Sequence, residues 1–397
     1  MPTVQRGPRG TFAYQQELIV QEMMARVALL EAQMHPVTTV LNSLEKGLIT
    51  ENPEPQHSED QMIPNIDRIV GAQTAVQVNL PVANPLYYIP GYQIFFPRTG
   101  ETARVTAAPG TSPITATRAW GQTTPPAALL DGEIVWILGD ASPEGGDSRV
   151  AINTLEVPYT EFCQVIRNSI ESTDVAMGTR TLGNDFEDQA EKKLMEHKRQ
   201  MEYFVKLGTR DRRLETTPTG AQQWVRTMGS LRERIQINRV LVGGIMGEGE
   251  WDAIVELAGQ FGNARKLALM GGTPYRAISN FARNRLQTVP EDESYGLRLR
   301  RYEGDITVDI IRDRELKGDV LGGWVMIIDP DYLVPRYLFV DEGTVGVDSK
   351  YTGSQYTKRV ENIQPNDRAG RKDEWYSCMC VQMIQEQVHV IAEDIRG

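Results

Sequence analysis

The sequence is poor in the residues from which disulfide frameworks and metal sites are built. In 397 residues it has four histidines and three cysteines, Cys163, Cys378 and Cys380. A sparse, odd set of cysteines does not form a disulfide framework, and it suits a protein that folds in a reducing cytoplasm. The spacing of Cys378 and Cys380 places both on one face of a strand. With no further cysteine nearby, we expect two core side chains rather than part of a zinc site.

Long apolar runs are also missing. The first ten residues, MPTVQRGPRG, lack the apolar core of a secretion signal. No run approaches the ~20 apolar residues that a helix needs to span a bilayer. We therefore expect a protein that is made and folded in a cytoplasm and that has no membrane partner.

Positive charge is in deficit. Lys and Arg number 42 against 53 Asp and Glu, which gives a formal net charge of −11. Proteins that grip duplex phosphates favour a clustered basic surface, so the balance argues against nucleic acid as the main ligand. It leaves room for a local basic patch.

The motifs of common chemistries are absent as well. There is no His-Glu-x-x-His motif, no Gly-x-Ser-x-Gly elbow and no Walker A loop, and the glycine-rich stretch 243–250 lacks the Lys and Ser/Thr that hold phosphate and magnesium. The stretch 270–276, MGGTPYR, fits a plain strand–helix turn better than an anion site at a helix N-terminus. His197 falls on an apolar helical stripe and is expected to be structural. We predict no catalytic, cofactor-binding or metal-binding residue.

We expect the charged clusters to be solvated surfaces, loops or subunit contacts rather than catalytic sites. The pair Glu187 and Glu191 is expected on a solvated helix face, and the acidic run 291–293 is expected in a loop. The basic runs 210–213 and 298–301 suit either phosphates or the acidic surface of a neighbouring subunit. The net negative charge favours subunit contacts.

What the chain does contain is an N-terminal arm and a β-rich region. The 35 Gly and 22 Pro point to many turns. Residues 14–34 have helical periodicity that ends at Pro36, residues 37–47 predict a second short helix, and residues 49–60 are polar and extended. Such an arm can bury its apolar stripe on neighbouring subunits.

The next part, residues 68–140, is expected to form a small β-unit. It contains five runs of strand length: 68–80, 86–96, 102–108, 113–120 and 133–138.

The strongest helix is predicted over residues 184–208. Asn184 and Glu187 form a capping-box pattern, Gly208 is a C-terminal stop, and the length corresponds to ~35 Å at ~1.5 Å per residue. One stripe collects its apolar positions and a histidine: Phe186, Ala190, Leu194, His197, Met201 and Phe204. A long helix with a single apolar stripe is typical of a spine on which a sheet lies.

A compact α+β domain is expected over residues 216–330. Its predicted helices are 217–229, 248–262 and 274–286, the last with Thr273 as N-cap and Pro274 at its first position. Its predicted strands are 266–272, 296–302, 304–313 and 322–329. The tail, residues 331–397, is mostly strand and loop.

Taken in order, several segments resemble one family. The first matches are Gly100-Glu101 before Val105-Thr106, then Arg118, Gly121 and Thr124 at a shifted spacing, Glu144-Gly145, and Tyr159, Thr160 and Phe162 with Pro158 in place of the family's Asn. Later matches are Glu202 to Gly208 at the end of the long helix, a strand pair centred on Gly304, and Glu386 and His389. In these features the chain resembles the major capsid proteins of tailed bacteriophages, which share the Hong Kong-type capsid fold. The matches run over residues 80–397; the first 60 residues match only as a helix followed by a Pro-Val/Thr hook.

The resemblance implies an α+β phage major capsid fold, in the branch with a β-rich extended loop. Its plan divides the chain into an N-terminal arm (1–65), an extended loop that laps over an adjacent subunit (66–152), a peripheral domain with the spine helix (153–215, completed by 336–397) and an axial domain (216–335). It implies a viral structural protein of the virion and no enzyme. Hexamers and pentamers would self-assemble in the host cytoplasm into an icosahedral head around double-stranded DNA, held non-specifically. Portal, scaffolding and decoration proteins would be partners.

Three alternatives stay open. An encapsulin-like nanocompartment shell has the same fold, but cellular shells tend to lack the β-rich insertion of residues 66–152. Tail-tube and decoration proteins are usually all-β and shorter, so the spine helix argues against them. A soluble enzyme would need a substrate-sized pocket lined by residues with perturbed pKa values.

Overall fold

The chain divides into two compact units in the computed structural model: His57–Tyr159, and Met1–Gln56 together with Thr160–Gly397. The residues that the structure describes are 36–43, 47–121, 125–140, 142, 144, 151–179, 185–216, 220–281, 286–288, 299–338, 357–363 and 369–396. The predicted arm helix 14–34, the N-cap Asn184, the acidic run 291–293 and Arg298 lie outside these residues.

The unit His57–Tyr159 is built on a six-stranded antiparallel sheet with the order β3-β8-β5-β6-β7-β4. Its strands are β3 (Ile66–Arg68), β4 (Asn79–Leu80), β5 (Tyr92–Phe96), β6 (Glu101–Ala107), β7 (Ile114–Thr117) and β8 (Ile134–Asp140). Alternate residues of β5 and β6 point into one core, which is the pattern that the sequence predicts for half-buried strands. Gly100 closes the β5–β6 turn at a φ of +67°, a conformation that favours glycine.

Two of the predicted strand runs in this unit are only partly strands. The run 68–80 is interrupted because Gly71 adopts a φ of +75° and turns the chain, so that isolated bridges replace a continuous ladder. The run 86–96 begins with a 3-10 helix, η3 (Pro85–Tyr87), before β5. Pro85 sets the first helical φ there, and the buried Tyr88 hydroxyl donates to Asp67 over 3.1 Å. Local turn chemistry therefore overrides the apolar pattern at both places.

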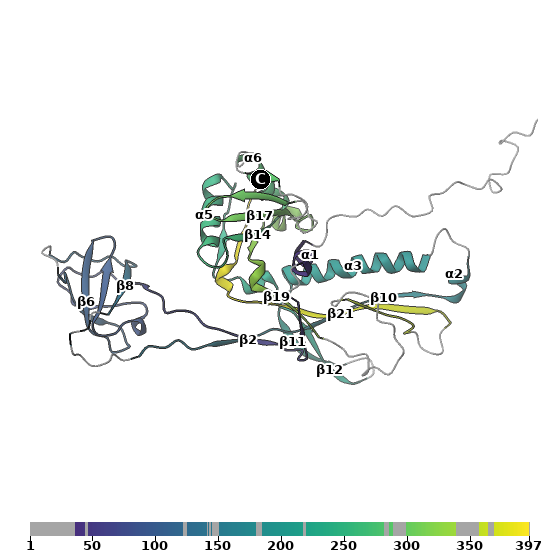
Figure 1. Cartoon of the computed structure of the whole chain (residues 1–397), viewed down its shortest axis with the longest axis horizontal. Coiled ribbons are helices and arrows are strands. Elements are labelled where there is room, and N and C mark those ends of the chain that lie inside the picture. Colours follow the sequence, from purple (N-terminus) through teal and green to yellow (C-terminus); the bar gives the residue numbers. More distant parts are fainter. Residues whose placement is uncertain are drawn as a thin grey trace, which may run out of the picture. The chain divides into compact units, whose positions relative to one another are not determined.

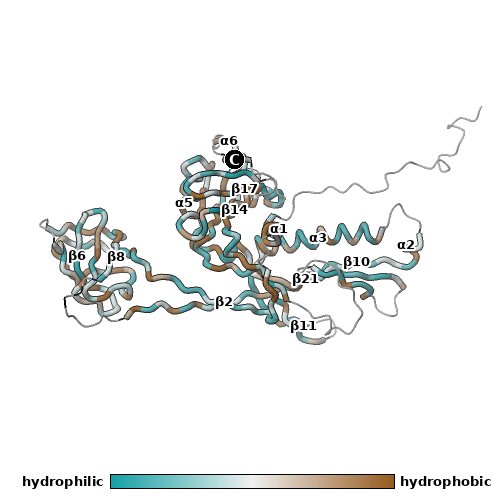
Figure 2. The backbone as a smooth tube through the Cα atoms, in the orientation of Figure 1, coloured by the Kyte–Doolittle hydropathy of each residue, from teal (hydrophilic) through white to brown (hydrophobic). Residues whose placement is uncertain are grey.

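The other unit contains the predicted spine helix, α3 (Asp185–Leu207), which lies along strands β10 (Gln164–Ser172) and β21 (Arg371–Met383) (Figure 1). Most of the helix is hydrophilic, and hydrophobic positions recur along it (Figure 2). Of the predicted stripe, Phe186, Ala190, His197 and Met201 are buried, and Leu194 and Phe204 are half-buried. The predicted spine helix and its buried stripe are confirmed.

A five-stranded sheet supports this helix. Its order is β1-β19-β21-β10, and β20 also pairs with β21. The remaining strands are β1 (Leu48–Thr50), β19 (Leu333–Leu338) and β20 (Lys358–Val360). Strand β1 overlaps the segment 49–60 predicted as extended and starts one residue before it. It follows α1 (Pro36–Ser43), which overlaps the second predicted helix, 37–47, and also starts one residue before it. Residues from the N-terminal part of the chain thereby complete a sheet formed mainly by its C-terminal part.

A seven-stranded mixed sheet forms the second core of this unit, with the order β13-β22-β18-β14-β17-β16-β15. Its strands are β13 (Arg239–Leu241), β14 (Arg265–Met270), β15 (Leu286–Thr288), β16 (Leu299–Glu303), β17 (Thr307–Arg312), β18 (Val325–Ile328) and β22 (Val390–Glu393). Strands β14, β17 and β18 are buried on both faces, which suits their nearly continuous apolar sequences. Helices α5 (Glu248–Gly259) and α6 (Gly272–Phe281) accompany it, so the predicted α+β class is confirmed.

The helix predicted over residues 217–229 is wrong. The described part of this segment is strand β12 (Gln222–Thr227), which pairs with β11 (Asp211–Thr216) as an antiparallel hairpin. Leu214 lies opposite Trp224, and such apolar and aromatic cross-strand pairs stabilise a ladder. Most residues of both strands are exposed.

The predicted start of α6 at Thr273 is also wrong. The helix begins at Gly272, and the Thr273 N–H donates to the carbonyl of Gly322 over 3.1 Å. The two chains approach so closely here that a Cβ on Gly271 would lie 2.3 Å from the Gly322 carbonyl oxygen. Backbone contact with a distant turn therefore starts this helix in place of a side-chain cap.

Candidate functional site

A buried charge cluster ties the C-terminal half of α3 to two distant segments. Lys206 is fully buried and forms ion pairs with Glu202, at 2.8 Å, and with Asp313. Glu202 also accepts the N–H groups of Val37 and Thr38 at 3.0 and 2.9 Å, and so caps the first turn of α1. Three parts of the chain that are far apart in sequence are therefore joined through Glu202 and Lys206, in a cluster that we call the Lys206 cluster.

Electrostatics keep Lys206 charged despite its burial. Burial by itself lowers the pKa of Lys206, but the carboxylates of Glu202 and Asp313 outweigh it and raise the pKa above its usual value. A second set of contacts lies over the two preceding turns of the helix, where the Tyr203 hydroxyl donates to Glu315 and Arg199 pairs with Glu315 at 3.1 Å. The spine helix is thus held to the segment after β17 by paired charges as well as by apolar packing.

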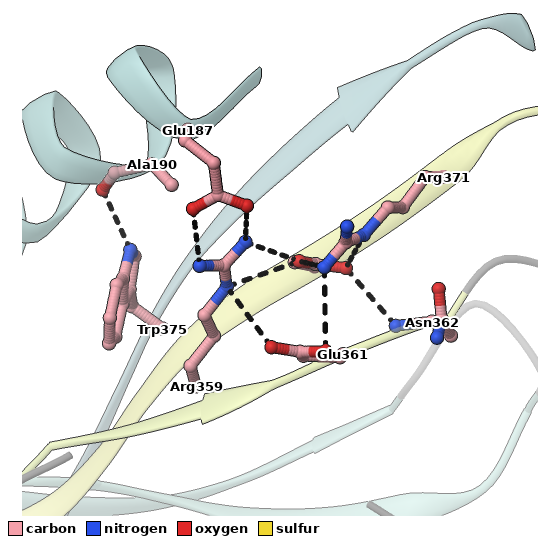
Figure 3. Close-up of polar contacts among 8 residues, drawn as sticks. Glu187, Ala190, Arg359, Glu361, Asn362, Arg371 and Trp375 are labelled. Atoms are coloured by element: carbon pink, nitrogen blue, oxygen red, sulfur yellow. Dashed lines mark hydrogen bonds and ion pairs between the residues drawn. The ribbon is translucent and has the colours of Figure 1, made fainter. Parts of the chain in front are cut away.

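An arginine network fastens β20 and β21 to the N-terminal half of α3 (Figure 3). Arg359 binds Glu187 with two hydrogen bonds, of 2.8 and 2.9 Å, and donates to Asp373 at 2.8 Å. Arg371 approaches Asp373 at 2.7 Å, and the Asn362 N–H donates to the same carboxylate. Burial alone would raise the pKa of Asp373, but these donors, Arg371 foremost, hold it below its usual value.

This network corrects the interpretation of Glu187. The sequence predicted a solvated charged face for the pair Glu187 and Glu191, yet the Glu187 carboxylate is engaged by Arg359. The hydrogen bonds from Arg359 are the main reason that the pKa of Glu187 lies below its usual value. Trp375 adds a hydrogen bond of 2.9 Å to the carbonyl of Ala190, so polar contacts from β20 and β21 reach two successive turns of the helix. The sequence could not predict this contact because Arg359 is 172 residues away from Glu187 along the chain.

His197 is a structural histidine, as predicted. It is fully buried, with Nδ1 2.7 Å from the side-chain oxygen of Asn168 and Nε2 2.8 Å from the hydroxyl of Ser377. Burial lowers its pKa to about 4. The ring is therefore neutral near neutral pH and links α3 to both β10 and β21.

We expect His197 to make the protein less stable in mild acid. The unfolded chain binds a proton at a pKa of ~6.5. The folded chain resists that proton until about pH 4. Stability is then lost as the pH falls from ~6.5 towards the folded pKa, by about 2 kcal/mol between about pH 7 and about pH 5. The variant His197→Gln removes this proton, so its urea midpoint should change less over that range than that of the wild type. Equal changes in both proteins would contradict the assignment.

The residues Glu386 and His389, which match the capsid family, also have structural roles. Glu386 accepts the N–H groups of Gln236 and Ile237, the latter at 2.6 Å. His389 is buried and accepts the Asp329 N–H at 3.2 Å, and burial lowers its pKa to about 3. Both residues fix turns beside the seven-stranded sheet.

The matching pair Gly100-Glu101 leads to a buried ion pair in the unit His57–Tyr159. Glu101 receives two hydrogen bonds of 2.6 Å from Arg118, and both side chains are buried. The backbone N–H groups of Ala119 and Ala127 also donate to Glu101, and Arg118 donates to the Ala127 carbonyl at 2.7 Å. Burial raises the pKa of Glu101, but Arg118 and the two N–H groups outweigh it and lower the pKa. The pair holds the segment after β7 against β6.

One face of the same unit exposes a row of large apolar side chains. On β8, Ile134, Trp136 and Leu138 are 43%, 39% and 57% exposed, whereas Val135 between them is fully buried. Ile66 on β3 lies opposite Trp136 and is 42% exposed. Exposed apolar side chains in a contiguous row mark interaction sites on folded proteins. We call these four residues the β8 stripe.

The basic run 210–213 is engaged within its own chain. Arg212 binds Glu54 through two hydrogen bonds, of 3.0 and 2.8 Å, and Arg226 binds the same carboxylate at 2.9 Å. Hydrogen bonds from Arg226 and Arg212 lower the pKa of Glu54. Arg213 pairs with Asp211 two residues away. These contacts anchor the β11–β12 hairpin at the point where the chain leads into β2 (Gln56–Glu59).

A hollow of about 290 Å³ beside Lys266 bears on the enzyme alternative. Its lining includes Asn263, Arg265, Lys266, Asp309, Asp329 and Asp331. Burial lowers the pKa of Lys266 to about 8. Its Nζ donates to the carbonyls of Phe261 and Val388 at 2.8 and 2.6 Å, so Lys266 also ties two backbone segments together.

The structure also bears on the anion-binding and metal-binding sites considered from the sequence. Near the N-terminus of α6, the N–H groups of Gly271 and Thr273 donate to backbone carbonyls of Trp324 and Gly322, which favours the plain turn over an anion site. Among the described residues, no three His, Cys, Asp or Glu side chains lie together in a way that would hold a metal ion. In the same residues, no helix combines the length and apolarity needed to cross a membrane.

Comparison with known proteins supports the capsid resemblance. The family described as SU10 major capsid protein matches residues 9–396. No curated protein matches the sequence significantly. The capsid of a native GTA particle has a TM-score of 0.51 at 6% identity and covers 97% of this chain and 98% of its own. That likeness, over nearly the whole of both chains, supports the predicted fold.

Two further solved structures are similar at lower TM-scores. A capsid chain of Mycobacterium phage Adephagia has a TM-score of 0.44 at 9% identity, covering 96% of this chain and 95% of its own. An encapsulin from Synechococcus elongatus has a TM-score of 0.44 at 10% identity, covering 62% of this chain and 78% of its own. The family match, which spans nearly the whole sequence, favours a phage capsid over a nanocompartment shell. The chain belongs to the SU10 family of major capsid proteins, and it is a structural protein of the virion.

Proposed function

We propose that copies of this chain assemble through pentamers and hexamers into the icosahedral head that encloses phage DNA, and that they do so in the host cytoplasm. The observation that carries the proposal is the β8 stripe, Ile66, Ile134, Trp136 and Leu138, exposed on a unit that already has its own core. In a major capsid protein, the partner that is always present at high copy number is a second copy of the same chain. The stripe is then the surface that this second copy covers.

The domain plan follows the capsid family. We assign residues 1–65 to an N-terminal arm, 66–152 to the extended loop, 153–215 with 336–397 to the peripheral domain, and 216–335 to the axial domain. The assignment is supported by the six-stranded sheet within 66–152 and by the spine helix within 153–215. The extended loop would lap over an adjacent subunit, which is where its exposed apolar residues would be buried.

Assembly would rest on many modest contacts. Burying one Trp or Leu side chain contributes about 1.5–3 kcal/mol, which is too little to hold two subunits by itself. In a closed symmetric shell each subunit has several neighbours, and each contact raises the effective concentration of the next. The Lys206 cluster and the Arg359 network would keep each subunit rigid enough for these contacts to form together.

The remaining partners follow from the same role. Packaged double-stranded DNA would be held without sequence recognition, and the net charge of −11 suits a wall that contains DNA without gripping it. Portal, scaffolding and decoration proteins would bind the assembled head. No catalytic role or cofactor is proposed.

Charged substitutions in the β8 stripe should prevent assembly. In the double variant Trp136→Glu, Leu138→Glu, each subunit contact loses the burial of two large apolar side chains. Since ~1.4 kcal/mol is a factor of ten, each contact should weaken by at least about tenfold. Particles should disappear from light scattering and electron micrographs, while the circular dichroism spectrum of the subunit stays unchanged.

The matched control is Thr117→Glu, an exposed position on β7 of the same unit. It adds one of the same charges without removing apolar surface, so particles should still form. Normal particles from the double variant would show that the stripe is not an assembly contact. Loss of particles in both variants would show that added charge alone is responsible.

A further inference from the structure

Two of the three cysteines face each other inside the five-stranded sheet. The sulfur atoms of Cys163 and Cys380 are 3.4 Å apart, and both residues are buried. Gln164, the first residue of β10, pairs with Met379 on β21; Cys163 directly precedes Gln164 and Cys380 directly follows Met379, so the two cysteines adjoin the end of this antiparallel ladder. The third cysteine, Cys378, lies opposite Val165.

This register is compatible with a disulfide. Opposed residues on antiparallel strands have Cα atoms ~4.5–5.5 Å apart, and disulfides join Cα atoms ~4.4–6.8 Å apart. Cys163 and Cys380 lie next to such a pair, and their sulfur atoms, 3.4 Å apart, need to approach by only ~1.4 Å to reach the ~2.05 Å of a disulfide bond. We propose that Cys163 and Cys380 are an oxidisable pair, which a peroxide converts into an intramolecular disulfide.

The surroundings give the two thiols different roles. The hydrogen bond with Cys380 is the main reason that the pKa of Cys163 is lowered, and the positive charges of Arg226 and Arg336 add to it. That hydrogen bond, followed by burial, raises the pKa of Cys380. The thiolate is the reactive form of cysteine, so Cys163 is the attacking residue and Cys380 the resolving one.

The chemistry balances with hydrogen peroxide as the oxidant. The Cys163 thiolate attacks one peroxide oxygen, the O–O bond breaks, and the products are a sulfenic acid on Cys163 and hydroxide. The Cys380 sulfur then attacks the Cys163 sulfur and displaces the sulfenic oxygen, which leaves as water with the thiol proton. In sum, two thiols and one hydrogen peroxide give one disulfide and two waters. Peroxide is close to water in size, so local opening of the sheet is enough to admit it.

The disulfide would stabilise the folded subunit as an intramolecular cross-link. It would join residues 217 positions apart and enclose the spine helix and the seven-stranded sheet, apart from β22, in one loop. A cross-link that closes so long a loop removes much of the conformational freedom of the unfolded chain. The pair would stay reduced in a cytoplasm and would oxidise in surroundings that contain peroxide.

The test is peptide mapping of the full-length protein after exposure to hydrogen peroxide, with free thiols blocked under denaturing conditions. We expect a linked peptide pair that is two hydrogen atoms lighter than its parts, joins Cys163 to Cys380, and is lost on treatment with dithiothreitol. The cross-link should be internal, so the subunit should remain a monomer on a non-reducing denaturing gel. The oxidised protein should also have a higher melting temperature than the reduced one.

Serine variants show whether the link uses Cys163 and Cys380 or involves the neighbouring Cys378. Cys378→Ser should still form the link, whereas Cys163→Ser and Cys380→Ser should not. A link through Cys378, blocked free thiols at both positions after peroxide treatment, or sulfinic and sulfonic acids without a link would each overturn the proposal. The wild-type map decides the question even if a serine variant fails to fold.

Discussion

The variant Lys206→Ala is expected to be about 3–5 kcal/mol less stable than the wild type, because it leaves buried carboxylates without their counter-charge. Glu202 and Asp313 are both buried against this lysine, so neither can turn to water without disrupting its segment. Glu202 must also continue to accept the N–H groups of Val37 and Thr38. The change should lower the urea midpoint followed by circular dichroism and reduce the yield of folded protein.

The control for this prediction lies on the same helix. Lys198 is exposed, so Lys198→Ala removes an equal charge from α3 but should change stability by no more than about 0.5 kcal/mol. Comparable urea midpoints for Lys206→Ala and Lys198→Ala would mean that the Lys206 cluster contributes nothing to holding α1, α3 and the segment after β17 together.

The second large effect is expected from Arg118→Ala in the unit His57–Tyr159. Removing the guanidinium leaves the buried Glu101 with two backbone N–H donors and no counter-charge, a change that costs about 3–5 kcal/mol in comparable buried pairs. Because the pair joins β6 to the segment after β7, amides of both should exchange faster with deuterated water. Hydrogen-exchange mass spectrometry measures this unit separately from the rest of the chain.

Arg68→Ala provides the comparison for Arg118→Ala, because Arg68 is an exposed arginine on β3 of the same unit. Its exchange pattern should resemble that of the wild type. Arg118→Lys should be intermediate, since a lysine restores the charge but not the paired hydrogen bonds. Unchanged exchange of β6 and of the segment after β7 in Arg118→Ala would contradict the structural role assigned to the pair.

Elements with strong local signals could be predicted from the sequence. The spine helix combines a capping pattern, an apolar stripe and Gly208 as a stop, and it appears within one residue of the predicted bounds. The strands β6 and β8 alternate or are apolar throughout, and both appear. The helix predicted over 217–229 is wrong because the strand found there depends on pairing with β11. Such pairing is set by non-local contacts that a local pattern does not contain.

The burial of the charged residues in the Lys206 cluster could not be predicted from the sequence. Glu202 and Lys206 are four residues apart, which on a helix suggests a solvent-exposed ion pair. Their position next to Met201 and Val205, both buried, was the available hint. Asp313, which accounts for the burial of the lysine, is 107 residues away. The family, by contrast, could be predicted because its matches depend on the order of many segments and not on any single site.

The central claim is that this chain builds a closed icosahedral shell, and electron cryomicroscopy of the purified full-length protein tests it most directly, alone and after co-expression with a scaffolding protein. We predict closed particles whose reconstruction shows fivefold and sixfold arrangements of one subunit, with the β8 stripe covered by a neighbouring copy. A protein that remains monomeric in both preparations, or particles in which the β8 stripe faces solvent, would contradict the account.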